Sequence, residues 1–320
     1  MRRADVRTAP SGMIDVVRHI LILSVIFQHM QSESRYSPEV NALIGTMSLY
    51  IDGAVAGFFM ISGYYLRIPE AFRWNEARLQ AGRAFRRLIV PFLLFSAVYG
   101  VLLVALGKIS MADALRSISL PQGIGPQMYF LSYLFGIQLL TRTAFSLIAP
   151  RGRIHVLALS FAAFSVGSLY LPTERSTGPA YWLLVFYQAA FLFGMLVADL
   201  ERGSSGSRAV TAMLAVSLAV LGIADTSSRL FDFALVAALL CAALAVAREP
   251  WLRHRLAGSG GIYLLHTPIL NHAISTALVA VGVNGVANLL AAFLATYVVA
   301  LTLTLAVIRL LPSTRTLLLE

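Results

Sequence analysis

The hydrophobic positions of the chain fall into long runs, and short polar segments rich in arginine separate them. A helix needs about 20 apolar residues to cross the hydrocarbon core of a bilayer, and most of the runs approach that length. The runs cover residues 13–32, 44–66, 87–107, 127–148, 154–171, 180–198, 209–224, 230–247, 259–281 and 285–310. The pattern therefore predicts an all-α membrane helix bundle with about ten transmembrane helices.

The composition excludes an ordinary soluble globule. Hydrophobic residues make up 58% of the 320 positions and charged residues only 12%, whereas soluble domains are about 25% charged. No linker or low-complexity tract separates a second unit, so residues 1–320 are expected to form one membrane-embedded domain without an appended soluble domain. The single cysteine, Cys241, excludes an internal disulfide, and no zinc motif or other metal site is predicted.

The net charge of +10 is explained by topology. If the N-terminus is cytoplasmic, the inner segments hold 19 basic residues and the outer loops hold 5. Such an excess of arginine and lysine marks the cytoplasmic side, and an even number of spans places both termini there. The basic residues therefore give no reason to expect a nucleic-acid partner.

The first span carries ionisable side chains at membrane depth, where they are functional candidates because burying them is costly. Arg18 and His29 are eleven positions apart, so they share one helix face and lie roughly 16 Å apart along the axis. That layout suits an elongated substrate with its anionic end near Arg18 and its reacting end near His29. Two simpler interpretations stay open: Arg18 as an interfacial anchor paired with Asp15, and His29 as an interfacial histidine.

Four further polar residues are candidates for supporting roles: Asp52, Ser62, Tyr263 and His266. Asp52 could orient an imidazole or could lie at the outer interface. Tyr263 and His266 are spaced i, i+3 ahead of Pro268, which can free a carbonyl group and kink the ninth span. On straight helices His266 would fall in the cytoplasmic half and His29 near the outer end, so a pair of the two would require a bend or a shorter first span.

The segment from Arg67 to Leu88, which leads from the second span into the third, contains six arginines. Arg83 and Arg86, with Arg87 adjacent, would present forked donors to phosphate groups. The alternatives are plain cytoplasmic charge and binding of anionic lipids. The second span ends with Ser62 and Gly63, which allow close helix packing or a bend.

Four segments together resemble the acyltransferase-3 family of integral membrane acyltransferases, typified by bacterial O-acetyltransferases of surface polysaccharides. They are the Arg18-to-His29 spacing, the stretch Gly57-Phe58-Phe59-Met60-Ile61-Ser62-Gly63-Tyr64, the Arg83-Ala84-Phe85-Arg86 pair and the segment Ile262-Tyr263-Leu264-Leu265-His266. The four occur in the expected order, each at its expected span, and the resemblance covers essentially the whole chain.

The resemblance implies transfer of an acyl group, acetyl in most members, from cytoplasmic acyl-CoA to an acceptor hydroxyl at the outer side. By position, Arg18 and His29 match the family's essential pair, Arg83 and Arg86 match its CoA-associated pair, and His266 matches a common late histidine. The implied location is the bacterial inner membrane. His29 would be the general base, and direct transfer is preferred over an acyl-histidine intermediate.

The expected partners are acyl-CoA as donor substrate, a glycan or other hydroxyl acceptor and membrane lipids. A homo-oligomer and other envelope-polysaccharide proteins stay open, and no permanently bound cofactor is expected. The main rival function is a transporter or flippase for an anionic or glycan-linked substrate. Inverted repeats would favour that alternative, and the sequence shows no clear repeat.

Overall fold

The computed structural model describes residues 12–30, 36–49, 51, 53–120, 123–124, 127–170, 181–203, 229–246 and 257–318. These residues form helices and no strand, which agrees with the predicted all-α class. Asp52 and the predicted span 209–224 lie outside the described residues.

Three helices within the described part are long and apolar enough to cross a membrane: Gly12–His29, Trp74–Ala105 and Gly285–Leu310. A fourth is counted if the helices at Tyr129–Ser146 and Pro150–Gly167, bent by 118° at their junction, make one broken span. The molecule is therefore a helical protein with membrane-spanning character. The count of ten spans and the cytoplasmic position of both termini stay predictions.

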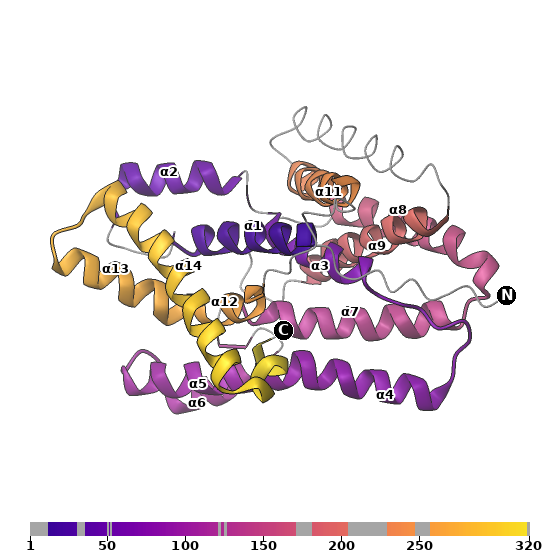
Figure 1. Ribbon diagram of the computed structural model, residues 1–320, viewed down its shortest axis with the longest axis horizontal. Coiled ribbons are helices and arrows are strands. Elements are labelled where there is room, and N and C mark those ends of the chain that lie inside the picture. Colours follow the sequence, from indigo (N-terminus) through magenta and orange to yellow (C-terminus); the bar gives the residue numbers. More distant parts are fainter. Residues whose placement is uncertain are drawn as a thin grey trace.

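Helix α1 (Gly12–His29) runs through the middle of the bundle (Figure 1). It contacts α2 (Pro38–Leu49), α3 (Ala54–Tyr64), α11 (Arg229–Val246), α12 (Ser259–Leu265) and α14 (Gly285–Leu310). Ile22 and Ile26 are completely buried, because neighbouring helices cover α1 on several sides. Helix α1, which carries Arg18 and His29, is thus packed on several sides at the centre of the bundle.

Two of the predicted spans are broken. The run 44–66 forms α2 and α3, with a break between them. The run 259–281 forms α12, a π-helical turn η5 (His266–Leu270) and α13 (Asn271–Ala280). Apolar content alone does not reveal such breaks, because a broken span keeps the hydrophobicity that lipid and core packing require.

The third span is longer than predicted. Helix α4 (Trp74–Ala84), the π-helical turn η2 (Phe85–Ile89) and α5 (Val90–Ala105) join into one helix of 32 residues, which forms a straight line along the lower edge of Figure 1. Its polar first part belongs to the arginine-rich segment. A short helix, α6 (Met111–Ile118), then packs against α5.

Helices α7 (Tyr129–Ser146), α8 (Arg153–Tyr170) and α9 (Tyr181–Gly203) complete the described bundle. Helix α9 crosses α3 at glycines, where a methyl group on Gly63 would fall on the carbonyl oxygen of Phe191, and one on Gly194 on that of Met60. The two backbones touch, which confirms the close packing predicted at Gly63. Beside this crossing, Phe59 stacks on Tyr187 with ring centroids 4.5 Å apart.

One face of α14 is apolar and exposed. Leu290, Leu294 and Val298 repeat every four residues and are each more than half exposed. Water would make such a stripe unfavourable, whereas lipid tails are as apolar as leucine. The stripe agrees with a face of the bundle that contacts the bilayer.

Candidate active site

The site is centred on a pair of histidines from distant parts of the chain. His29 is the last residue of α1, and His266 opens the π-helical turn η5. His29 Nδ1 lies 3.0 Å from His266 Nε2, and the two rings are stacked, nearly parallel, with centroids 5.1 Å apart. The structure therefore brings together two residues that straight helices would have kept apart.

The hydrogen-bond network determines which ring nitrogens carry protons when both histidines are neutral. His266 Nδ1 lies 2.8 Å from the carbonyl oxygen of Tyr263, which can only accept, so this nitrogen is the donor. The Nε2 atom of neutral His266 then has the lone pair and accepts a hydrogen bond from His29 Nδ1. It follows that His29 Nε2 carries a lone pair, which is the form that a general base requires.

A break in the ninth predicted span makes this pairing possible. Thr267 has extended backbone angles (φ −137°, ψ 158°) between two helical segments, and Pro268 cannot donate a backbone hydrogen bond. Side chains from other elements satisfy the carbonyl groups that the break frees: Tyr99 donates to Leu264 and Gln127 donates to Thr267. The helix therefore has the bend that the sequence analysis required for this pair, at Thr267, the residue after His266.

A cavity of about 710 Å³ lies beside Tyr263, the residue three positions before His266. Its wall is formed by α1, α3, η2, α7, α12, α14 and the final 3-10 turn η6 (Pro312–Leu318). The polar and charged lining residues are Asp15, Arg18, Ser62, Tyr65, Arg87, Gln138, Arg142, Ser259, Tyr263 and Arg315. Four arginines against one carboxylate give the lining of this cavity an excess of positive charge.

The position of Arg18 is compatible with both interpretations that the sequence left open. Its Nη1 donates to Asp15 Oδ1 at 2.9 Å, as expected for an anchored residue. Its guanidinium also lies over the Tyr65 ring, 5.7 Å from the centroid, and lines the cavity. Because the side chain is 27% exposed, it can reach a ligand while Asp15 and Tyr65 hold it in place.

The supporting candidate Ser62 and the three predicted acyl-CoA-binding arginines are divided. Ser62 and Arg87 line the cavity, whereas Arg83 and Arg86 are exposed and are not among its lining residues. The π-helical turn at Phe85–Ile89 inserts an extra residue into the helix. That insertion rotates the later positions by about 100° relative to a regular α-helix, so the face deduced from regular spacing does not hold through this turn.

Tyr263 connects the cavity with the histidines. It is buried, lines the cavity, and its ring centroid is 6.0 Å from that of His266. Tyr263 is therefore a lining residue that also neighbours the histidine pair.

A family model described as an acyltransferase domain, acyltransferase-3, matches residues 12–309. The chain belongs to this family. The match spans every element of the site except the final turn η6, and it agrees with the resemblance found in the sequence motifs. Neither curated proteins nor solved structures gave a match to this acyltransferase.

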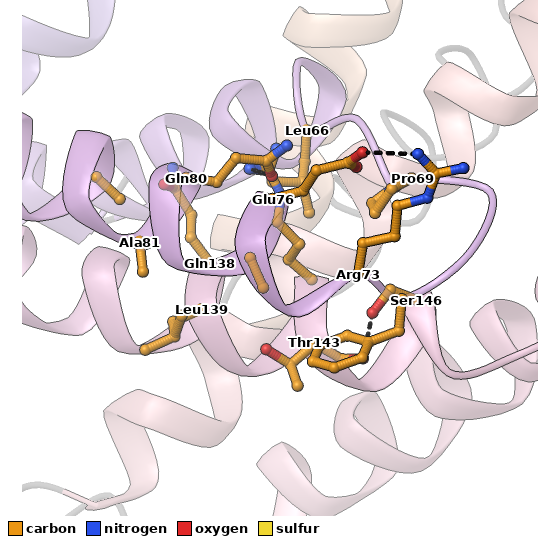
Figure 2. Close-up of a pocket in the computed structure, with 14 residues that line it drawn as sticks. Leu66, Pro69, Arg73, Glu76, Gln80, Ala81, Gln138, Leu139, Thr143 and Ser146 are labelled. Carbon is orange, nitrogen blue, oxygen red and sulfur yellow. Dashed lines mark hydrogen bonds and ion pairs between the residues drawn. The ribbon is translucent and has the colours of Figure 1, made fainter.

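A second, smaller cavity of about 40 Å³ lies between α4 and α7 (Figure 2). The ion pair between Arg73 and Glu76 at its edge is 3.3 Å long and largely exposed, so it contributes little to stability. The space suffices for little more than water, and the acyltransferase would need the larger cavity for any substrate of ordinary size. Within the part of the chain that the structure describes, no group of three His, Cys, Asp or Glu side chains could hold a metal ion.

Sequence reasoning missed four residues of the site: Tyr99, Gln127, Arg142 and Arg315. Tyr99 and Gln127 hold the broken helix, and the two arginines line the cavity. Gln127 and Tyr99 gave a weak signal, as polar groups within or beside apolar runs. Nothing in the sequence distinguished Arg142 and Arg315 from arginines that only determine topology.

Proposed function

We propose that this acyltransferase moves an acyl group, acetyl in the simplest case, from cytoplasmic acyl-CoA to a hydroxyl group of an extracytoplasmic or membrane-associated glycan. The observation that carries the proposal is the His29–His266 pair. Its 3.0 Å contact, together with the bond from His266 to the Tyr263 carbonyl, leaves the lone pair on His29 Nε2. A neutral imidazole held in one tautomer is suited to remove a hydroxyl proton near neutral pH.

The arginine-lined cavity supports acyl-CoA as the donor. CoA carries several phosphate groups, and arginine binds phosphate through charge-assisted, forked hydrogen bonds. The volume of about 710 Å³ lies within the range of about 300–1,000 Å³ that is common for ligand sites. Arg18, Arg87 and Arg315 are the residues to which we assign the phosphate groups.

The position of the cavity supports donor entry from the cytoplasm. Most of its polar and charged lining residues lie near the start of α1 and α12, near the end of α3, and near or after the ends of α7 and α14. In the topology deduced from the arginine distribution, these helix ends all face inward. The pantetheine arm would extend past Arg18 and Tyr263 and bring the thioester to the histidines, about 16 Å from Arg18 along α1.

The proposed reaction is a direct transfer. His29 Nε2 takes the proton of the acceptor hydroxyl while its oxygen forms a bond to the thioester carbonyl carbon. The carbon–sulfur bond then breaks, and the thiolate of CoA takes the proton back from His29 Nε2. His266 stays neutral throughout and accepts the hydrogen bond from His29 Nδ1, which stabilises the imidazolium that forms transiently. General base catalysis of this kind contributes about 100- to 10,000-fold.

A bacterial inner-membrane location with both termini cytoplasmic completes the proposal. Its supports are the family, the apolar helices and the split of 19 basic residues against 5. The rival function, a transporter or flippase, could use the same basic cavity. It has no requirement for a histidine pair in a defined tautomer at the end of that cavity.

Cells that express the protein provide the test of the acceptor class. Surface glycans are extracted from cells with wild-type protein, with His29→Ala or without the gene, and their masses are compared. His272→Ala is the matched control, because His272 is an exposed histidine on α13 outside the site. We expect an acyl mass increment with wild type and His272→Ala, and none with His29→Ala. Equal increments with wild type and His29→Ala would refute the proposal.

A further inference from the structure

Gln127 forms hydrogen bonds on both sides of His266, with the side chain of Tyr263 and with the backbone of Thr267. It lies two residues before the start of α7, and only 1% of it is exposed. Its backbone carbonyl accepts a hydrogen bond from the hydroxyl of Tyr263 at 2.6 Å. Its side-chain Nε2 donates to the carbonyl oxygen of Thr267 at 2.5 Å. One residue from a distant segment therefore holds the chain three positions before and one position after His266.

These two bonds act on the groups that orient His266. The carbonyl group of Tyr263 accepts the proton of His266 Nδ1, so the position of Tyr263 determines the direction of the imidazole. Thr267 is the residue with extended backbone angles at the break. Tyr99 adds a third bond, to the carbonyl oxygen of Leu264, but only Gln127 contacts both sides of the histidine.

The amide of Gln127 has one allowed orientation. The Thr267 carbonyl can only accept a hydrogen bond, so Nε2 must point toward it. The Oε1 atom is then buried and has no hydrogen-bond partner among the described residues. Buried polar atoms without partners are rare in proteins, and each calls for a reason. Here the reason is that the bond to Thr267 requires this orientation.

We propose that Gln127 is a positioning residue for the transfer reaction: it holds the broken helix so that His266 accepts from His29 and keeps the lone pair on His29 Nε2. The inference rests on the proposed function, because its effect on rate is an effect on acyl transfer. It adds a residue that acts through His266 and contacts no substrate. Gln127 is not among the cavity-lining residues, so its loss should change turnover and leave donor binding intact.

Steady-state kinetics of acyl transfer by the purified, full-length protein in lipid nanodiscs provides the first test. Gln127→Met keeps the length of the side chain but removes the donor to Thr267. We expect kcat to fall at least about tenfold, with KM for acetyl-CoA within twofold of wild type. The matched control is Gln188→Met, since the Gln188 amide also donates across helices, to Thr141 Oγ1 at 2.9 Å, away from the histidines. A kcat within twofold of wild type for Gln127→Met would overturn the inference.

A double-mutant cycle separates positioning from general stability. If Gln127 acts through His266, Gln127→Met should cause less than a twofold further loss once His266→Gln is present. Losses that multiply would show that Gln127 acts independently of His266 and would overturn the inference. If Gln127→Met does not fold, Tyr263→Phe removes the bond to the Gln127 carbonyl from the other side. It should likewise lower kcat, here at least about threefold, and an unchanged kcat would count against the inference.

A substrate-free measurement keeps this inference distinguishable from the proposed function. The ¹⁵N shifts of histidine ring nitrogens report which nitrogen is protonated, and the chain has six histidines, so His29→Ala identifies the signal of His29. We expect a single Nδ1–H tautomer of His29 in wild type and Gln188→Met, and a mixture of tautomers in Gln127→Met. An unchanged tautomer in Gln127→Met would overturn the inference even if the protein transfers acyl groups. Absence of transfer by wild type, with the expected shifts, would overturn only the proposed function.

Discussion

Replacing Arg18 with lysine separates its two roles in the structure. Arg18 donates to Asp15 at 2.9 Å, lies over the Tyr65 ring and lines the cavity. Lysine keeps the positive charge and can still pair with Asp15, so an interfacial anchor should survive the change. Lysine lacks the planar fork, however, and cannot bind Asp15 and a ligand phosphate or carbonyl at the same time with the same geometry.

The size of the effect follows from the number of bonds lost. Asp15 uses one guanidinium N–H group, and the remaining ones are available to a ligand on the cavity side. Loss of one hydrogen bond to a charged group costs about 1.5–3 kcal/mol. With tenfold in rate or affinity for each 1.4 kcal/mol, Arg18→Lys should lower kcat/KM for acyl-CoA roughly 10- to 150-fold.

Release of CoA from acetyl-CoA in the presence of an acceptor is the suitable assay, at limiting and saturating donor, with expression and thermal stability measured in parallel. Arg309→Lys is the matched control, because Arg309 is exposed at the end of α14 and does not line the cavity. Wild-type kcat/KM in Arg18→Lys would refute the positioning role and leave Arg18 as an anchor.

Two further predictions follow from the packing and from the cavity. Arg315→Ala should weaken CoA binding, measured by calorimetry, by up to about fivefold, because an exposed ion pair contributes about 0.2–1 kcal/mol. Arg83→Ala should leave CoA affinity unchanged. A loss of CoA affinity in Arg83→Ala but not in Arg315→Ala would show that the cavity is not the donor site. Gly63→Ala should destabilise the protein by about 1–3 kcal/mol, because the added methyl group meets the Phe191 carbonyl. Gly45→Ala in α2 has open space and should leave the melting temperature unchanged or slightly raised; equal melting temperatures for the two variants would contradict the packing at Gly63.

The sequence predicted those parts of the fold that depend on helical periodicity. The bounds of α1, α7 and α14 agree with the apolar runs, because a continuous helix buries or exposes its side chains at regular intervals. Of the two possibilities raised for Gly63, close helix packing is the one found, since close approach of two helices needs a residue without a side chain. The break within 44–66 was not predicted, and the break within 259–281 was expected only as a kink that Pro268 could cause, because hydrogen bonds from other elements hold such breaks.

In the candidate site, too, the residues that follow regular helical spacing were predicted, whereas those that depend on irregular turns were not. Arg18 and His29 follow from spacing on one helix, and the structure places them as a cavity-lining residue and as half of the histidine pair. His266 was expected at another depth because regular geometry was assumed through Pro268. Arg87 lines the cavity from a π-helical turn, and Arg315 lines it from the terminal 3-10 turn. Irregular turns of this kind leave no periodic signal in the sequence.

The central claim is that His29 is the base of an acyl-CoA-dependent transfer. The most direct measurement is the rate at which the purified protein in lipid nanodiscs releases CoA thiol from acetyl-CoA in the presence of a glycan acceptor, compared between wild type and His29→Ala. Calorimetry with CoA shows in parallel that the variant still binds the donor. The account predicts measurable release by wild type, at least about 100-fold slower release by His29→Ala, and equal CoA affinity. Equal rates for wild type and His29→Ala would contradict it.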